Sequence, residues 1–170
     1  MNNYKVQQAY VNDPEIVKQL HTFYRDTLGY ECISQVVDKE RQLKGIDTII
    51  SRRIGFKEYT IDEKIRTKDY DDMLLEIRSN ALTGKVGWTI DLDKVTDMIV
   101  YVCMDTKRVF VLDYKQLRRL TLNNLFEWTF NRPKERHDVY NEDGNETLCY
   151  SIKWEELKAA GLYVKEYKLN

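Results

Sequence analysis

The first regular pattern of apolar and polar residues covers residues 12–29, with the sequence NDPEIVKQLHTFYRDTLG. Four apolar residues recur at helical spacing and fall on one face: Ile16, Leu20, Phe23 and Leu28. Asp13 is suited to cap a helix, Pro14 to occupy its first position, and Gly29 to end it. The segment therefore predicts an amphipathic helix that packs against a core.

Short apolar runs separated by turn residues dominate the rest of the chain. These runs predict β-strands over residues 44–51, 57–66, 73–78, 95–104, 108–114, 147–152 and 162–167. Helices are predicted from about residue 115 and over residues 154–161, and residues 131–146 are predicted to form a charged loop. This order of elements indicates a mixed α+β or α/β fold with one central sheet.

Length and composition favour one domain spanning residues 1–170, with a core at about residues 13–120 and a C-terminal extension of about residues 121–170 packed on it. The net charge of −1 does not indicate a general nucleic-acid binder, although it is compatible with a local basic face. No apolar run is long enough to predict a membrane span, and no signal peptide is predicted. Three scattered cysteines suit a reducing compartment, so we expect a cytoplasmic protein.

Two neighbouring predicted strands carry acidic residues, which strand interiors usually lack. One lies in GIDTII, residues 45–50, and the other lies in YTIDEKIR, residues 59–66. Because side chains alternate between the two faces of a strand, Asp62 and Lys64 share one face. If the two strands pair as a hairpin, Asp47 can reach the same face.

Two carboxylates and an ammonium group on one face suggest a site for a divalent cation. Mg²⁺ takes oxygen ligands, often one or two carboxylates with several retained waters. Asp47 and Asp62 would bind the ion, and the backbone carbonyl of Glu63 would add a ligand. Lys64 would orient the attacking water or stabilise developing charge. The Glu63 side chain points to the other face and is expected to pair structurally. The alternative is a salt bridge on a solvated sheet face.

The pattern G-I-D, followed by I-D-E-K, resembles the motif of the PD-(D/E)XK nuclease superfamily, which has the restriction-endonuclease-like fold. The resemblance covers roughly residues 13–104 and includes a helix before the two motif strands. Ile46 stands where the motif has proline. The acid that the family usually carries on its helix has no clear counterpart, and Glu15 and Asp26 are the candidates. Small bacterial or phage members are the most similar.

The resemblance implies a central mixed β-sheet flanked by helices and Mg²⁺-dependent hydrolysis of DNA phosphodiester bonds, with Mn²⁺ as an alternative ion. It implies that Asp47, Asp62 and Lys64 are catalytic, and that Asp47, Asp62 and Glu63 bind the metal. DNA is the expected partner, with a homodimer or a protein partner left open and no membrane. The alternative, from a different class, is a non-catalytic phage or bacterial binding or accessory protein on the same fold.

Other charged residues have an ordinary explanation beside a functional one. Glu76 would join the site if its strand paired next to the second motif strand, opposite Glu63. Asp97 lies near the start of a predicted apolar strand, and the turn chemistry at the start of a strand explains an acidic residue there as well as catalysis does. Basic clusters in RVFVLDYKQLRR and NRPKERH could follow phosphates or form charged surface.

Overall fold

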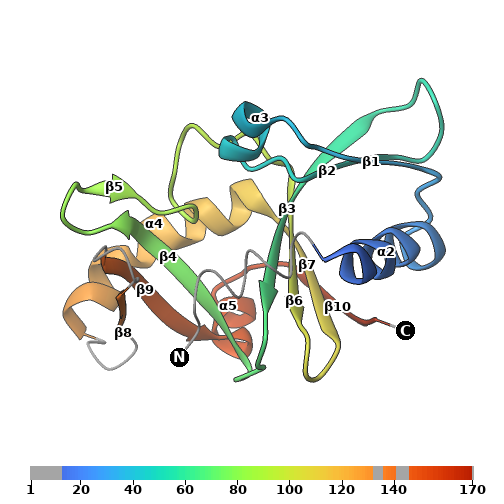
Figure 1. Cartoon of the computed structure of the whole chain (residues 1–170). Helices are drawn as coiled ribbons and strands as arrows, with labels where there is room; N and C mark the ends of the chain where they lie inside the picture. Colours follow the sequence, from blue (N-terminus) through green and yellow to red (C-terminus); the bar gives the residue numbers. More distant parts are fainter. Residues whose placement is uncertain (1–12, 132–135, 141–145, 170) are drawn as a thin grey trace. The chain divides into compact units, whose positions relative to one another are not determined.

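The computed structural model describes residues 13–131, 136–140 and 146–169 (Figure 1). The chain divides into two compact units that each draw on separate segments. The first unit comprises residues 1–69, 93–114 and 165–170, and the second comprises residues 70–92 and 115–164. The predicted core of about residues 13–120 therefore takes residues from both units, and the boundary predicted near residue 121 does not coincide with a boundary between them.

The first unit contains a six-stranded mixed sheet with the strand order β1-β2-β3-β6-β7-β10. Its strands are β1 (Cys32–Gln35), β2 (Thr48–Ser51), β3 (Glu58–Arg66), β6 (Met98–Cys103), β7 (Arg108–Asp113) and β10 (Val164–Lys168). Strand β2 pairs antiparallel with β1 and with β3, whereas β3 runs parallel to β6. The predicted hairpin of the two motif strands is confirmed, and so is the mixed α+β class.

The predicted first helix is present as α2 (Pro14–Thr22), which continues into the π-helix η1 (Phe23–Thr27). Asp13 caps α2, because its Oδ1 accepts a hydrogen bond from the N–H of Glu15 at 2.8 Å. A further short helix, α3 (Lys39–Leu43), precedes β2 and was not predicted, since its residues KERQL show no apolar face.

Apolar residues of α2 and η1 pack with those of the sheet to form the core of the first unit. The cluster comprises Ile16, Leu20, Phe23, Tyr24, Ile50, Ile61, Ile65, Val100, Val102, Val109, Val111 and Leu169. Ile61 and Ile65 alternate with Asp62 and Lys64 along β3, so the packing of one face fixes which way the other face points. Burying each large apolar side chain contributes about 1.5–3 kcal/mol.

The second unit contains a separate four-stranded sheet with the strand order β5-β4-β9-β8. Its elements are β4 (Asp72–Asn80), β5 (Lys85–Val86), β8 (Arg136–Tyr140), β9 (Glu146–Lys153), α4 (Tyr114–Asn131) and α5 (Trp154–Ala159). Among the described residues, no helix combines the length and apolar character needed to cross a membrane.

The expectation of one central sheet is therefore wrong. Residues 73–78 form a strand as predicted, but β4 pairs with β5 and β9 in the second sheet. Alternation predicts a strand without indicating its partner. Residues 136–140 of the predicted charged loop form β8, while residues 132–135 and 141–145 lie outside the described part of the chain.

Candidate functional site

The candidate site lies where β2 begins beside the middle of β3. The predicted strand over residues 44–51 starts only at Thr48, so Asp47 lies immediately before β2. Its N–H still donates to the carbonyl of Ile61 at 2.8 Å, which continues the pairing with β3. Its carboxylate Oδ2 accepts the backbone N–H of Glu63, also at 2.8 Å. This second hydrogen bond holds Asp47 against the motif segment of β3.

Asp62 is a buried acid between two lysine side chains. Its residue surface is 1% exposed. The Nζ of Lys64 donates a hydrogen bond to Oδ1 at 2.5 Å, and the Nζ of Lys94 lies 3.6 Å from Oδ2. Oδ2 is buried and accepts no hydrogen bond from the part of the chain that the structure describes. Lys64 thus donates to one oxygen of Asp62 and Lys94 lies beside the other, and a hydrogen bond between the side chains of Asp47 and Asp62 also lowers the pKa of Asp62.

Asp47 and Asp62 lie close enough to change each other's pKa. Burial raises the pKa of Asp47 to about 7, and the charge of Asp62 adds to this effect, while Lys64 opposes it. Burial alone would also raise the pKa of Asp62, but the ammonium groups of Lys64 and Lys94 outweigh it and hold that pKa below its usual value. Near neutral pH, Asp62 is therefore ionised, whereas Asp47 is partly protonated and partly ionised.

Glu63 points away from this cluster, as alternation along β3 predicts. Its Oε1 accepts hydrogen bonds from the hydroxyl of Tyr24 at 2.7 Å and from Oγ1 of Thr48 at 2.8 Å. Burial raises the pKa of Glu63, and the two hydrogen bonds oppose that shift. Tyr24 lies in η1, and π-helical turns frequently occur near functional sites. The Glu63 side chain thus connects η1 and β2 to β3, and only its backbone carbonyl is a candidate ligand.

Sequence reasoning missed Lys94 and the role of Gly45. Gly45 has φ +78°, and a Cβ at this position would lie 3.1 Å from Nζ of Lys94 and 3.3 Å from Oδ2 of Asp62. The N–H of Val95 donates to the carbonyl of Lys44 at 3.0 Å, which brings the segment of Lys94 beside the turn of Gly45. The glycine in GIDTII was a signal for close approach, whereas Lys94 had no sequence signal.

Two further acids do not join the cluster. Glu76 lies on β4, where its register partner is Cys149, so the expected pairing opposite Glu63 is wrong. Glu63 instead lies beside Val100 of β6. Asp97 accepts hydrogen bonds from the N–H and the hydroxyl of Thr60 at 2.9 and 3.1 Å, which is a structural role at the entry of β6.

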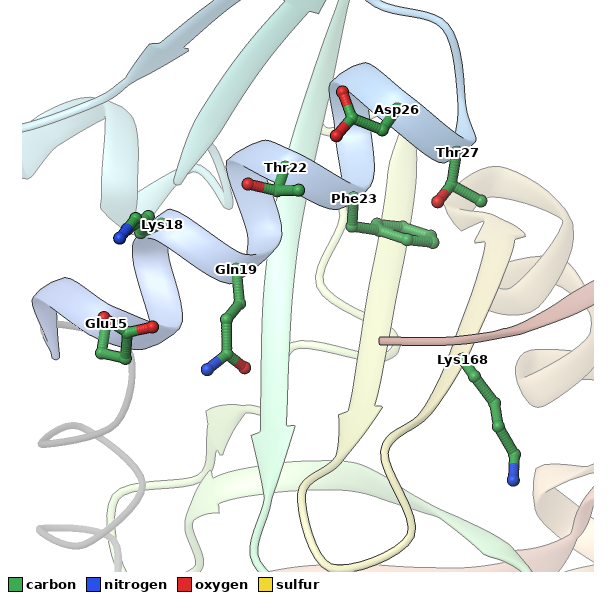
Figure 2. A pocket seen from close by; sticks show the side chains of 8 residues that line it. All are labelled: Glu15, Lys18, Gln19, Thr22, Phe23, Asp26, Thr27 and Lys168. Carbon is green, nitrogen blue, oxygen red and sulfur yellow. The ribbon is translucent and has the colours of Figure 1, made fainter. Parts of the chain in front are cut away.

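A hollow of about 180 Å³ lies elsewhere in the first unit, along α2, η1 and the end of β10 (Figure 2). Its lining residues are Glu15, Lys18, Gln19, Thr22, Phe23, Asp26, Thr27 and Lys168. Asp47, Asp62 and Lys64 are not among them. The two candidates for the acid on the helix, Glu15 and Asp26, thus line a different surface, and Asp26 is paired with Arg25 at 2.9 Å.

Comparison with protein-family models, with curated proteins and with solved structures finds no match for this chain. Across the described residues, no group of three or more His, Cys, Asp or Glu side chains is arranged to hold a metal ion. The candidate site thus consists of two carboxylates, two lysines and the backbone around them.

Proposed function

We propose that this chain is a metal-dependent nuclease of the PD-(D/E)XK type that hydrolyses DNA phosphodiester bonds. One observation carries the proposal: the carboxyl groups of Asp47 and Asp62 interact with each other beside the ammonium group of Lys64, and Asp62 is buried. The restriction-endonuclease-like fold belongs to the proposal as well. It is supported by the helix α2 and by the motif acids, which lie at the start of β2 and on β3 of a mixed sheet.

The residues present are chemically suited to a hard divalent cation. Mg²⁺ is usually held by one or two carboxylates and keeps several waters, so a third acidic side chain is not required. Asp47, Asp62 and the carbonyl of Glu63 would hold Mg²⁺ or Mn²⁺, and Oδ2 of Asp62 is a buried acceptor without a hydrogen bond from the described chain. When bound, the ion supplies polarisation of a phosphoryl oxygen and a lowered pKa for its water.

The side chains around the pair have separate parts in this proposal. The side chain of Lys64 is 26% exposed, so its ammonium group can reach substrate or water while it is paired with Asp62. There it orients the attacking water or stabilises charge that develops on the phosphoryl group. The side chain of Lys94 is only 11% exposed and neutralises Asp62 from within. Asp47, with its pKa at about 7, takes up or releases a proton near neutral pH.

A second function, from another class, is favoured by the same charges. Lys64 and Lys94 already balance Asp62 without a cation, and the described residues provide no third acidic ligand. A non-catalytic binding or accessory protein could keep such a cluster as a structural salt bridge. Binding of a metal ion, rather than cleavage alone, separates the two functions.

Cleavage assays test the proposal directly. The purified chain would be incubated with plasmid, single-stranded and branched DNA in Mg²⁺ or Mn²⁺, alongside Asp62→Ala and Lys64→Ala. We expect the wild type to cut and each variant to lose about 10²-fold or more of the rate. Lys39→Ala and Glu40→Ala, at exposed positions of α3, are the matched controls and should cut as the wild type does. Cleavage that survives both site substitutions would contradict the site assignment.

The thermal midpoint with and without Mg²⁺ or Mn²⁺ distinguishes the nuclease from the binding protein. An ion at 100 times its dissociation constant stabilises the folded state by about 2.7 kcal/mol. We expect this stabilisation in the wild type and its loss in Asp62→Ala. If no DNA is cut and the thermal midpoint does not respond to either ion, the result contradicts the nuclease and supports the non-catalytic binding or accessory protein.

A further inference from the structure

The loop that joins β2 to β3 displays large apolar side chains to solvent. We call residues 52–57, with the sequence RRIGFK, the hairpin loop. Ile54 is 93% exposed and Phe56 is 61% exposed. In Figure 1 the hairpin loop lies at the end of β2 opposite to α3, and it protrudes from the six-stranded sheet. Two large apolar residues at the tip of such a loop need an explanation, because exposing them opposes the hydrophobic effect.

The turn itself does not require these apolar side chains. The N–H of Phe56 donates to the carbonyl of Arg53 at 3.1 Å, and Oγ of Ser51 donates to the same carbonyl, also at 3.1 Å. Gly55 supplies the left-handed conformation, with φ +82°. Backbone hydrogen bonds and one glycine thus close the turn, and Ile54 and Phe56 are left available for a partner.

The charge around the tip has one predominant sign. Arg52, Arg53 and Lys57 are all exposed, and Glu58 is the one acid between Ser51 and Tyr59. This excess of positive charge is local, because the whole chain has a net charge of −1. The Nζ of Lys57 lies 4.7 Å from the centre of the Tyr59 ring, which keeps this cation close to the base of the loop.

Exposed apolar residues flanked by cations are complementary to a nucleic-acid duplex. Cations bind phosphates, and apolar side chains such as Phe and Ile insert between base steps from the minor groove. We propose that the hairpin loop is a DNA-docking element: Arg52, Arg53 and Lys57 contact the phosphates of a duplex while Ile54 and Phe56 insert at a base step. This inference rests on the proposed nuclease function, because that function supplies the reason for DNA as the occupant.

The base of the hairpin loop lies at a distance from the acidic pair that a short duplex can span. A strand rises about 3.3 Å per residue, which places Ser51 ~13 Å from Asp47 along β2. Phosphates of one DNA strand follow each other every 3.4 Å along the axis, so this separation corresponds to about four base pairs. The antiparallel register Ile49↔Thr60 and Ser51↔Glu58 makes the spacing rigid. Docking at the loop would thus fix which phosphate lies at Asp47 and Asp62.

Two variants of the full chain separate the two kinds of contact. The first replaces the cations (Arg52→Gln, Arg53→Gln, Lys57→Gln), and the second replaces the apolar tip (Ile54→Ser, Phe56→Ser). The control replaces three exposed lysines of other segments (Lys85→Gln, Lys158→Gln, Lys165→Gln). Binding of a short labelled duplex is measured by fluorescence anisotropy in EDTA over a range of NaCl concentrations. Thermal melting of each variant establishes that it is folded.

The expected results differ between the variants. The loss of three phosphate contacts reduces the slope of log K against log salt by about 2 to 3 and weakens binding by about tenfold or more. The loss of the apolar tip weakens binding by about tenfold and leaves the salt slope unchanged, because stacking does not release counterions. The control should bind as the wild type does.

The inference would be overturned if the wild type did not bind the duplex, or if both hairpin-loop variants bound it as the wild type does. Binding of the same proteins to vesicles of phosphatidylcholine and phosphatidylserine gives a third outcome that would overturn it: the variants lose binding to vesicles but not to the duplex. The last outcome would assign the loop to a membrane surface. Cleavage by the same proteins keeps the two proposals distinct. Duplex binding through the loop without any cleavage in Mg²⁺ or Mn²⁺ supports docking and contradicts the nuclease. If the hairpin-loop variants bind the duplex and cleave it as the wild type does, the result contradicts docking through the loop but not the nuclease function.

Discussion

The ammonium group of Lys94 lies 3.6 Å from the buried oxygen of Asp62 that accepts no hydrogen bond from the described residues. In the proposed site this is the oxygen best placed for a cation. The ammonium group of Lys94 thus lies next to a candidate ligand atom of the metal ion. Lys94 therefore stabilises the metal-free protein and opposes the binding of an ion.

Replacing Lys94 with Met separates these two effects. Without the metal, Asp62 loses one of its two cations, so we expect the free energy of unfolding to fall by about 1–3 kcal/mol. The affinity for Mg²⁺ should rise, because no ammonium group competes for the same carboxylate. Urea unfolding in EDTA and calorimetric Mg²⁺ titration measure the two quantities. Lys39→Met, at an exposed position, should leave both unchanged. A Lys94→Met protein that is destabilised and binds Mg²⁺ more weakly would show that Lys94 supports the site.

Gly45→Ala tests the close approach of backbone and site. Gly45 and Gly29 both have positive φ, +78° and +75°, but nothing lies within 4 Å of a Cβ added at Gly29. Both alanine variants should lose roughly 1–2 kcal/mol from backbone strain. Only Gly45→Ala should also displace Lys94 and reduce metal binding and cleavage. Equal effects of the two substitutions on metal binding would contradict a specific role for Gly45.

Asp47→Asn tests the charge of the acidic pair through the pH dependence of stability. The folded-state pKa of Asp47 is raised from 3.8 to about 7, so its contribution to stability is complete below pH 3.8 and is lost as pH rises to 7. Asn keeps an oxygen that can accept the N–H of Glu63 but carries no charge. The variant should therefore gain stability relative to the wild type as the pH rises from about 4 to about 7, as followed by thermal melting without metal. A stability difference that does not change over this range would refute the raised pKa.

Tyr24→Phe and Glu63→Gln test the buried network below the site. Removing the tyrosine hydroxyl takes one of two side-chain hydrogen bonds from the Glu63 carboxylate, and we expect a loss of about 1–3 kcal/mol. The double variant should lose less than the sum of the single losses, because Glu63→Gln weakens the hydrogen bond that Tyr24→Phe removes. Chemical unfolding of the four proteins measures the coupling. Additive losses would mean that Tyr24 and Glu63 act independently.

The sequence was sufficient for the parts of the site that follow from local geometry. Alternation along β3 placed Asp62 and Lys64 on one face and the Glu63 side chain on the other. The alternating pattern was clear because Ile61 and Ile65 are core residues. The chemical role of these residues is still a prediction.

The parts that depend on distant segments could not be derived from the sequence. Lys94 approaches Asp62 through a loop hydrogen bond between Val95 and Lys44, and no local pattern predicts such a contact. Strand β4 was predicted as a strand but assigned to the wrong sheet, because its partner β9 lies far along the chain. Strand β1 was missed, since four residues with the sequence CISQ offer almost no periodic signal.

The division of the first unit into separate chain segments has a consequence for the order of folding. Strands β3 and β6 lie side by side in the sheet, yet residues 70–92 of the other unit separate them in the chain. The edge strand β10 is completed only at Lys168, and the core residue Leu169 follows it. During synthesis, the sheet that carries Asp62 therefore stays unfinished until Lys168 has left the ribosome. Removing residues 164–168 takes a strand from this sheet, although the acidic pair itself lies more than a hundred residues earlier.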